Sequence, residues 1–191
     1  MKKYLRLGAM LLLVSCGGHT PPRNLDDACA LTDERPTYLS AMQASEARWG
    51  VPVHVQMATI YQESKFVGNA KTRQTFFLGF IPTGRQTSAY GFSQAIDGAW
   101  DDYRSATGNS GARRTRIEDA TDFIGWYMDQ ANQRLGLPKY DASNQYLAYH
   151  EGLTGYQRGT YNAKAWLLRV AANVGERADR YQQQLIACGK S

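Results

Sequence analysis

The spacing of apolar residues along the chain predicts a mainly helical protein. From residue 36 onward, apolar positions recur every three or four residues in several segments, which is typical of helices that bury one face. We expect helices at 36–49, 52–64, 96–103, 119–135, 144–151 and 166–188. Prolines at first turns and glycines after last turns, such as Gly50 and Gly136, support these limits. The expected fold class is therefore mainly α, in one domain without internal repeats.

Residues 68–93 break the helical pattern. They are rich in Gly, Thr, Arg and aromatic residues and show no sustained period. A short β-hairpin is expected only around residues 76–81. Because a structureless connection of this length is uncommon inside a compact domain, we expect an irregular excursion that shapes a groove.

The first fifteen residues have the pattern of an export signal. Lys2, Lys3 and Arg6 precede the apolar run 7–14. A positive segment, a short apolar segment and a small residue before the cleavage site are the parts of a secretory signal peptide. The run is too short for a permanent transmembrane helix, which needs about 20 apolar residues. We therefore expect residues 1–15 to be a signal peptide.

Residues 13–16, Leu-Val-Ser-Cys, resemble a bacterial lipobox. The resemblance implies that Cys16 carries lipid and anchors the protein to a membrane. Since Gly17 stands where an Asp would retain such a protein at the inner membrane, it implies the periplasmic face of the outer membrane. We expect residues 16–28 to form a tether, followed by a domain over 29–191. The alternative is a plain signal peptide with an incidental cysteine.

Composition limits the function classes that remain. The chain has 191 residues, is 43% hydrophobic and carries a net charge of +5, which is a globular composition rather than a disordered one. The expected signal peptide contains three of these charges and no acid, which leaves +2 for the rest. A charge this small does not mark a polyanion-binding surface, so we expect no nucleic-acid partner.

Two cysteines remain if Cys16 carries lipid. Cys29 and Cys188 lie near the two ends of the expected domain. An even number of cysteines in an exported protein indicates a disulfide, because the compartment is oxidising. We expect Cys29 to pair with Cys188; the alternative is two buried free thiols.

Three short motifs contain candidate chemistry. The first is Tyr-Gln-Glu-Ser at 61–64, near the end of an expected helix. Ile60 and Phe66 lie three residues on either side of Glu63, so its carboxyl group is expected beside apolar neighbours. Partial desolvation raises the pKa of a carboxyl group, and a Glu protonated near neutral pH suits general acid catalysis. The alternative is a surface Glu on an amphipathic helix.

The other two motifs combine glycines with polar and aromatic groups. Gly-Phe-Ser-Gln at 91–94 contains Gly91, which permits close backbone approach, and the amide of Gln94. Ala-Tyr-His-Glu-Gly at 148–152 contains the phenol of Tyr149. Taken singly, these motifs are equally well explained as a turn and a helix end.

The order of the three motifs resembles the soluble lytic transglycosylase family, which belongs to the lysozyme-like group together with goose-type lysozymes. The resemblance covers about residues 50–160. Two positions depart from the family pattern: Gly-Leu-Met-Gln is Gly-Phe-Ser-Gln here, and the Asn after the Tyr is His150. The resemblance implies a lysozyme-like, monomeric α-helical enzyme of peptidoglycan that uses no metal or cofactor.

The family's residue roles are implied position by position. Glu63 would protonate the glycosidic oxygen between N-acetylmuramic acid and N-acetylglucosamine. It would then accept the proton of the muramyl C6 hydroxyl as a 1,6-anhydro ring closes. Substrate-binding or orienting roles fall on Ser64, Gly91, Gln94, Tyr149 and His150.

Two alternatives remain for the activity. Glu151 supplies a second carboxylate, and two carboxylates near the scissile bond would allow ordinary hydrolysis by a muramidase. Because it adjoins the matched Gly152, we expect Glu151 to brace a loop instead. The second alternative is a non-catalytic envelope lipoprotein that binds peptidoglycan.

Overall fold

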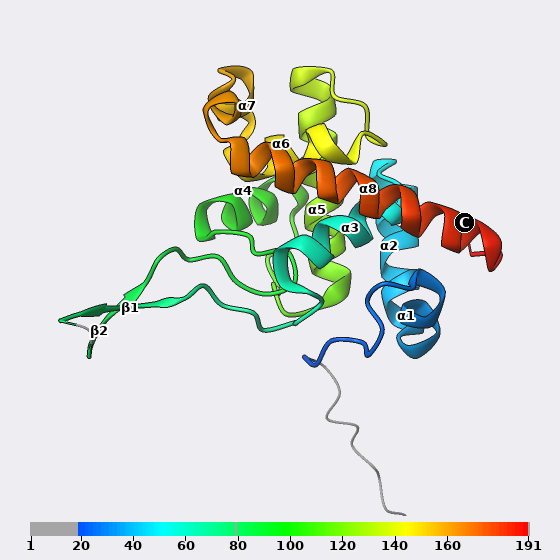
Figure 1. The fold of residues 1–191 in the computed structure, drawn as a ribbon, viewed down its shortest axis with the longest axis horizontal. Helices are drawn as coiled ribbons and strands as arrows, with labels where there is room; N and C mark the ends of the chain where they lie inside the picture. Colours follow the sequence, from blue (N-terminus) through cyan, green and yellow to red (C-terminus); the bar gives the residue numbers. More distant parts are fainter. Residues whose placement is uncertain (1–18, 79, 191) are drawn as a thin grey trace, which may run out of the picture.

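The structure, a computed structural model, describes residues 19–78 and 80–190 (Figure 1). The expected signal peptide and Cys16 lie outside these residues. The elements are α1 (Ala28–Glu34), α2 (Pro36–Trp49), α3 (Val53–Ser64), β1 (Gln74–Phe77), β2 (Ile81–Arg85), α4 (Asp97–Thr107), α5 (Ile117–Leu135), α6 (Ala142–Glu151), α7 (Leu153–Gln157), the 3-10 helix η1 (Thr160–Ala163) and α8 (Ala165–Ala187). The prediction of a mainly α fold with one short hairpin is confirmed for the described residues.

Helix α5 lies at the centre of the packing, against α2 on one side and α4, α6 and α7 on others. Its buried residue Phe123 contacts the rings of Trp100 and Tyr103 on α4, at centroid distances of 5.3 and 5.5 Å. The Tyr103 hydroxyl donates a hydrogen bond of 2.7 Å to Asp122. Aromatic pairs of this kind add to the stability gained by burying their area. The cluster fixes α4 against α5, and both helices contribute to the pocket described below.

Helix α8 packs along α3 and α6 (Figure 1). The helix expected at 166–188 is present, and α8 runs unbroken through Gly175 from Ala165 to Ala187. A Cβ atom at Gly175 would lie 2.2 Å from the Ser143 Oγ atom, so glycine allows α8 to approach the start of α6. In the described part of the chain, no helix, α8 included, has the length and apolar character needed to span a membrane.

The packed domain begins before Cys29. Tyr181 on α8 donates a hydrogen bond to the Leu25 carbonyl oxygen, and Arg177 forms an ion pair of 2.8 Å with Asp26. Asp27 caps α1 by accepting from the backbone N–H groups of residues 29 and 30. Part of the segment expected as a tether therefore lies against α8. The predicted disulfide between Cys29 and Cys188 is confirmed and joins α1 to the end of α8.

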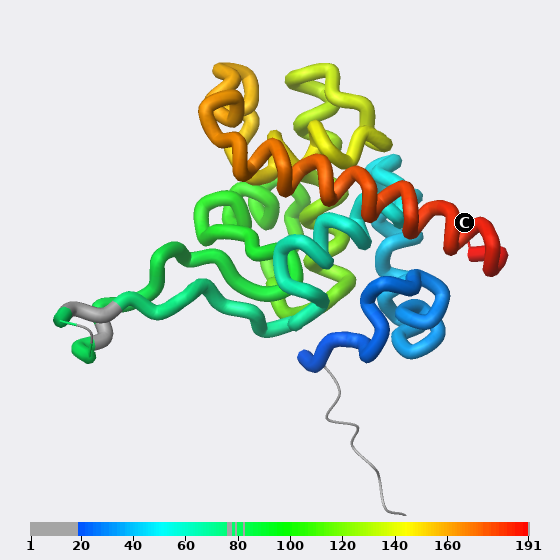
Figure 2. Tube along the Cα trace, viewed as in Figure 1, coloured from blue at the N-terminus to red at the C-terminus, as the bar shows by residue number. Residues whose placement is uncertain are grey.

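The hairpin forms an arm that projects from the helical body, to the left in Figure 1; the tube in Figure 2 follows its two limbs. Strands β1 and β2 are antiparallel, with Gln74 opposite Arg85 and a register shift after Thr75. Among the described elements, each strand contacts only the other. We call residues 71–87 the arm.

Candidate active site

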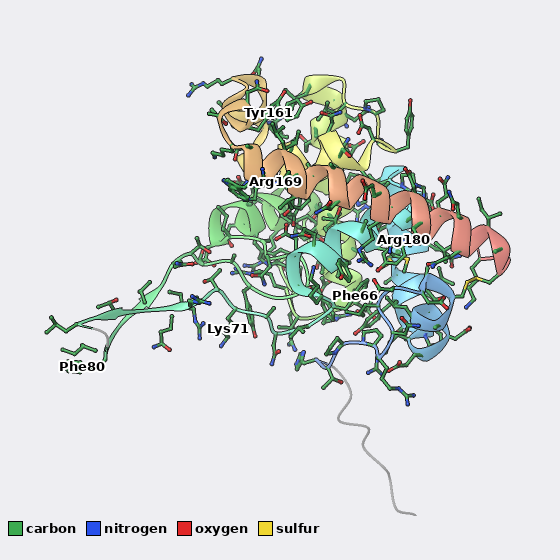
Figure 3. The ribbon with its side chains drawn as sticks, viewed as in Figure 1. Phe66, Lys71, Phe80, Tyr161, Arg169 and Arg180 are labelled. Atoms are coloured by element: carbon green, nitrogen blue, oxygen red, sulfur yellow. A yellow bond between two sulfur atoms is a disulfide. The ribbon has the colours of Figure 1, made fainter. Side chains whose placement is uncertain are left out.

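Helix α3 ends one residue after Glu63. The residue that follows the helix, Lys65, adopts a left-handed conformation with φ of 52°, and Phe66 follows with φ of 60°. Two consecutive non-glycine residues in this region are uncommon. The ring of Phe66, labelled in Figure 3, is fully buried and stacks on the ring of Tyr38, which holds the chain in this turn. The turn fixes the position of the last helical residues and of the Glu63 side chain.

Glu63 is half-buried and lines a pocket. Burial raises the pKa of its carboxyl group to about 7, because the charged form loses hydration. A hydrogen bond from Tyr146 and the positive charge of Lys65 act in the opposite direction and limit the rise. The group therefore exists in both protonation states near neutral pH, which suits a group that gives and takes a proton.

The pocket beside Glu63 has a volume of about 530 Å³. The root of the arm, α4, α5 and the end of α6 contribute to its lining. Its lining residues are Glu63, Thr72, Thr87, Ala89, Gln94, Ala95, Ile96, Ala99, Phe123, Tyr127, Tyr149, His150, Glu151 and Gly152. In the part of the chain that the structure describes, no three His, Cys, Asp or Glu side chains gather where a metal ion could bind.

A second pocket of about 900 Å³ adjoins the first. The two share Ala99, Tyr127, Glu151 and Gly152, so they form one continuous groove. The second pocket extends between α4, α5 and α7, past Trp126, Gln130 and Arg134. An open groove with aromatic and polar walls can hold an elongated ligand that passes Glu63.

Tyr149 connects α6 to the 91–94 turn. Its hydroxyl donates a hydrogen bond of 2.6 Å to the Ser93 carbonyl oxygen. Its ring packs against Tyr127 and Phe123 at centroid distances of 5.2 and 6.2 Å. Burial, followed by the nearby Glu63 charge, raises the pKa of Tyr149 well above its usual value. The phenol thus stays protonated at the pocket wall, beside Glu63.

The side chain of Gln94 faces the pocket with its amide nitrogen already bonded. That nitrogen donates to the carbonyl oxygens of Ala70 and Gly91, at 3.0 and 2.8 Å. Gln94 itself has a positive φ of 49°. These bonds join the arm's root to the 91–94 turn and leave the amide oxygen as the group that a ligand would meet.

Gly91 is buried and does not belong to the pocket lining. Its φ is 79°, and a Cβ atom there would lie 2.0 Å from the Arg114 carbonyl oxygen. The next residue, Phe92, donates its N–H to that same oxygen at 3.1 Å. The structure thus shows a packing role for Gly91, by bringing the turn against the 113–116 segment.

We expect Gly91→Ala to lower the free energy of unfolding by about 3 kcal/mol, because it adds a strained backbone conformation and an overpacked contact. Urea unfolding measures the loss. Gly108→Ala is the matched control, because Gly108 has a φ of 70° and open space around it. The control should lose only about 1 kcal/mol. Equal losses in the two variants would contradict the packing role.

Of the two remaining predicted residues, Ser64 lies away from the pocket lining and His150 lies at the pocket rim. The Ser64 hydroxyl donates to the Ile60 carbonyl oxygen of its own helix at 3.2 Å, away from the pocket lining. His150 is exposed at the pocket rim, with its ring against Trp166 at a centroid distance of 5.3 Å. Its Nδ1 atom lies 3.2 Å from a Glu151 carboxylate oxygen. The structure therefore brings Glu63, Gln94, Tyr149 and His150 together at one pocket.

Glu151 is held in a network at the end of α6. Only 4% of its side chain is exposed, and both carboxylate oxygens accept from Lys164 Nζ, at 2.7 and 2.9 Å. The Thr160 hydroxyl also donates to it. The hydrogen bonds from Lys164 and Thr160 lower the pKa of Glu151 to about 2. A carboxylate bound in this way connects α6 to the segment before α8.

Sequence reasoning missed Tyr146, whose phenol limits the rise in the pKa of Glu63. It is buried one helical turn before Tyr149. The available signal was the spacing of three residues, which puts both phenols on one face of α6. Burial is the main cause that raises the pKa of Tyr146 far above its usual value, so it remains a hydrogen-bond donor.

The chain was compared with known families and proteins. The sequence profile of the family described as "Transglycosylase SLT domain" matches residues 4–188. No curated protein matches the chain. The family match spans all the helices and strands that carry the groove.

Proposed function

The chain belongs to the transglycosylase SLT domain family, and on that premise we propose that it is a peptidoglycan lytic transglycosylase with Glu63 as both acid and base. One observation carries the proposal. Glu63 is half-buried in the wall of a groove, and burial raises its pKa to about 7. Half of such groups hold a proton near neutral pH, and the same oxygen can accept one when the group is charged.

The reaction proceeds through proton transfers at one carboxyl group. Protonated Glu63 gives its proton to the glycosidic oxygen as the bond from that oxygen to C1 of N-acetylmuramic acid breaks. The C6 hydroxyl of the same sugar attacks C1, and its proton passes to the Glu63 carboxylate. A C1–O6 bond replaces the bond that was lost, Glu63 is protonated again, and no water is consumed.

Other residues of the groove support this course. The phenols of Tyr146 and Tyr149, both kept protonated, lie around Glu63 as fixed dipoles. Gln94 presents its amide oxygen to a sugar hydroxyl or acetamido N–H group. His150 and the exposed ring of Trp166 flank the rim, where a sugar could pack.

We expect Glu151→Gln to keep the anhydro product, with a rate within a factor of about three of the unsubstituted protein. Glu151 is bonded on both oxygens and has a pKa near 2, so it is a poor base for activating water. The substitution should lower the free energy of unfolding by about 1 kcal/mol, because the Lys164 bonds weaken. Lys164→Met removes the same ion pair from the other side and should match it. A change of product type in either variant would assign Glu151 to the reaction.

The proposed activity is tested by digesting purified sacculi and analysing the muropeptides by mass spectrometry. We expect ends of 1,6-anhydro-N-acetylmuramic acid. Reducing ends, heavier by one water, would indicate a muramidase. Binding to sacculi without either product would indicate a non-catalytic wall-binding protein.

We also propose that the protein is an envelope lipoprotein, anchored through lipid on Cys16 after removal of residues 1–15. The support is the lipobox pattern in the sequence. The anchor would place the groove at the periplasmic face of the outer membrane, next to its polymer. Metabolic labelling with a radioactive fatty acid tests the anchor, since Cys16→Ala should abolish the label.

A further inference from the structure

The arm is the largest described feature that the proposed chemistry leaves without a role. Its limbs are held to each other: Arg85 donates to the Thr72 carbonyl oxygen at 2.6 Å, and the Thr72 hydroxyl donates to the Thr87 carbonyl oxygen at 2.9 Å. Only its root, at Thr72 and Thr87, reaches the pocket. The rest projects from the body (Figure 2).

The end of the arm is apolar and uncovered. Leu78, Phe80 and Ile81 are 69%, 71% and 44% exposed. In Figure 3, Phe80 lies at the far end of the arm and Lys71 near its root. Leaving large apolar side chains in water forgoes about 2 kcal/mol each relative to burial. Adjacent exposed apolar residues of this kind mark a contact surface.

The stem of the arm is cationic. Lys71, Arg73 and Arg85 lie on its two limbs, and the sequence has no Asp or Glu between Lys65 and Ile96. Of the ion pairs among described residues, none includes these three side chains. The arm thus presents unneutralised positive charge behind an apolar end.

We propose that the arm docks on a lipid bilayer that contains anionic lipids. Leu78, Phe80 and Ile81 enter the region between headgroups and acyl chains, while the cations of the stem contact the lipid phosphates. This order of apolar and positive groups along the arm matches the order of layers at a bilayer surface. Each Lys or Arg held near an anionic membrane adds about 1 kcal/mol of attraction.

The position of the arm's root favours a bilayer over a protein partner. The N–H group of Gly68, three residues before the arm, donates to the His19 carbonyl oxygen at 3.2 Å. His19 follows Cys16 by three Cα–Cα steps, which can span at most about 11 Å. If Cys16 carries lipid, as proposed above, the anchor therefore keeps the arm within reach of the membrane.

Docking of the arm would also set the distance between the groove and the bilayer. Leu78, near the end of the arm, follows Thr72 at the pocket by six residue steps, a reach of about 20 Å in extended chain. The arm would act as a spacer that holds the groove off the bilayer, toward the polymer. The choice of a bilayer as the partner rests on the lipid proposed for Cys16, and this spacing rests in addition on the proposed enzymatic function.

A spin label on the arm tests the contact in the lipid-anchored mature protein, reconstituted in vesicles. Phe80→Cys carries the nitroxide, and the unsubstituted protein is the labelling blank. In vesicles of phosphatidylethanolamine and phosphatidylglycerol, we expect more collisions of the nitroxide with oxygen and fewer with a water-soluble nickel chelate. In phosphatidylcholine alone the change should be smaller. Tyr140→Cys is the control, because Tyr140 is 73% exposed on another part of the surface and should stay aqueous.

Substitution of the charged residues of the stem measures how much they contribute to insertion of the arm into the bilayer. Lys71→Gln and Arg73→Gln should each lower the ratio of inserted to free arm by about fivefold, the factor that corresponds to 1 kcal/mol. Arg85 is left unchanged because it bonds within the arm. A label at position 80 that stays aqueous in both kinds of vesicle would overturn the proposal. Loss of both kinds of collision would overturn it too, since it would mean that protein covers the arm. Sacculus digestion, measured in parallel, reports separately on the enzymatic proposal.

Discussion

Glu63→Gln lowers the rate of muropeptide release from sacculi by about 10³-fold, according to the proposed mechanism. The amide keeps the size of the side chain but cannot give a proton to the glycosidic oxygen or take one from the C6 hydroxyl. General acid–base catalysis is typically worth 10²–10⁴-fold, and both transfers use this one group. The rate is measured by chromatography of soluble products under single-turnover conditions.

Glu46→Gln is the matched control for this substitution. Glu46 on α2 is also half-buried, and burial raises its pKa, but it does not line the pocket. Its substitution should leave the rate unchanged within a factor of about two. A comparable loss in both variants would attribute the effect to folding rather than to catalysis.

The same Glu63 substitution should stabilise the fold at high pH. The pKa of Glu63 is raised from 4.5 to about 7 in the folded protein, so the folded state holds the proton more tightly than the unfolded chain. The resulting penalty is absent below the unfolded pKa, grows as the pH rises and is complete above the folded pKa. At about pH 8, the free energy of unfolding of Glu63→Gln should therefore exceed that of the unsubstituted protein by about 3 kcal/mol. At about pH 4 the two free energies of unfolding should be equal. Higher activity together with lower stability is a common property of catalytic groups.

Removing the disulfide should cost about 5 kcal/mol of stability. The bond joins Cys29 to Cys188, which are 159 residues apart, so it restricts nearly all of the described chain when unfolded. A loss of this size is comparable to the whole stability of many domains. Urea unfolding of the double variant Cys29→Ala/Cys188→Ala measures it. At low temperature, where the double variant stays folded, its activity should persist, because the bond lies at the α1–α8 end, away from the pocket.

Reduction of the unsubstituted protein is the control for this result. Treatment with a thiol should bring its midpoint of unfolding down to that of the double variant. A loss below about 1 kcal/mol would mean that the unfolded chain is already restrained, or that the bond strains the native state.

Periodicity was sufficient for most of the helices, because their buried faces repeat every three or four residues. It missed α1, which is only seven residues long, although Asp27 caps it and could have indicated its start. It gave no role to Gly175, since a close approach between α8 and α6 cannot be seen in one helix alone. The hairpin was expected, but its length and its separation from the body depend on the absence of tertiary contacts, which no local pattern reveals.

The sequence was sufficient to predict the acidic residue of the site, Glu63, but not the hydrogen bonds that surround it. Neighbouring apolar residues indicated that Glu63 would be desolvated. The sequence did not reveal that a second phenol on the same face of α6, that of Tyr146, limits the rise in the Glu63 pKa, or that the Tyr149 hydroxyl donates to the Ser93 carbonyl oxygen. The commitment of the Gln94 amide nitrogen to two backbone carbonyls also depends on contacts between distant segments.

Digestion of sacculi in water enriched in heavy oxygen tests the central claim most directly. If Glu63 directs the C6 hydroxyl of the substrate onto C1, the new muramyl ends contain no oxygen from the solvent, and mass spectrometry finds 1,6-anhydro ends of unchanged isotopic mass. If muropeptide release disappears in the Glu63→Gln variant, the formation of those ends depends on this carboxyl group. Reducing ends that carry the heavy isotope would contradict the account, because they would show that water, and not the sugar's own hydroxyl, is the nucleophile.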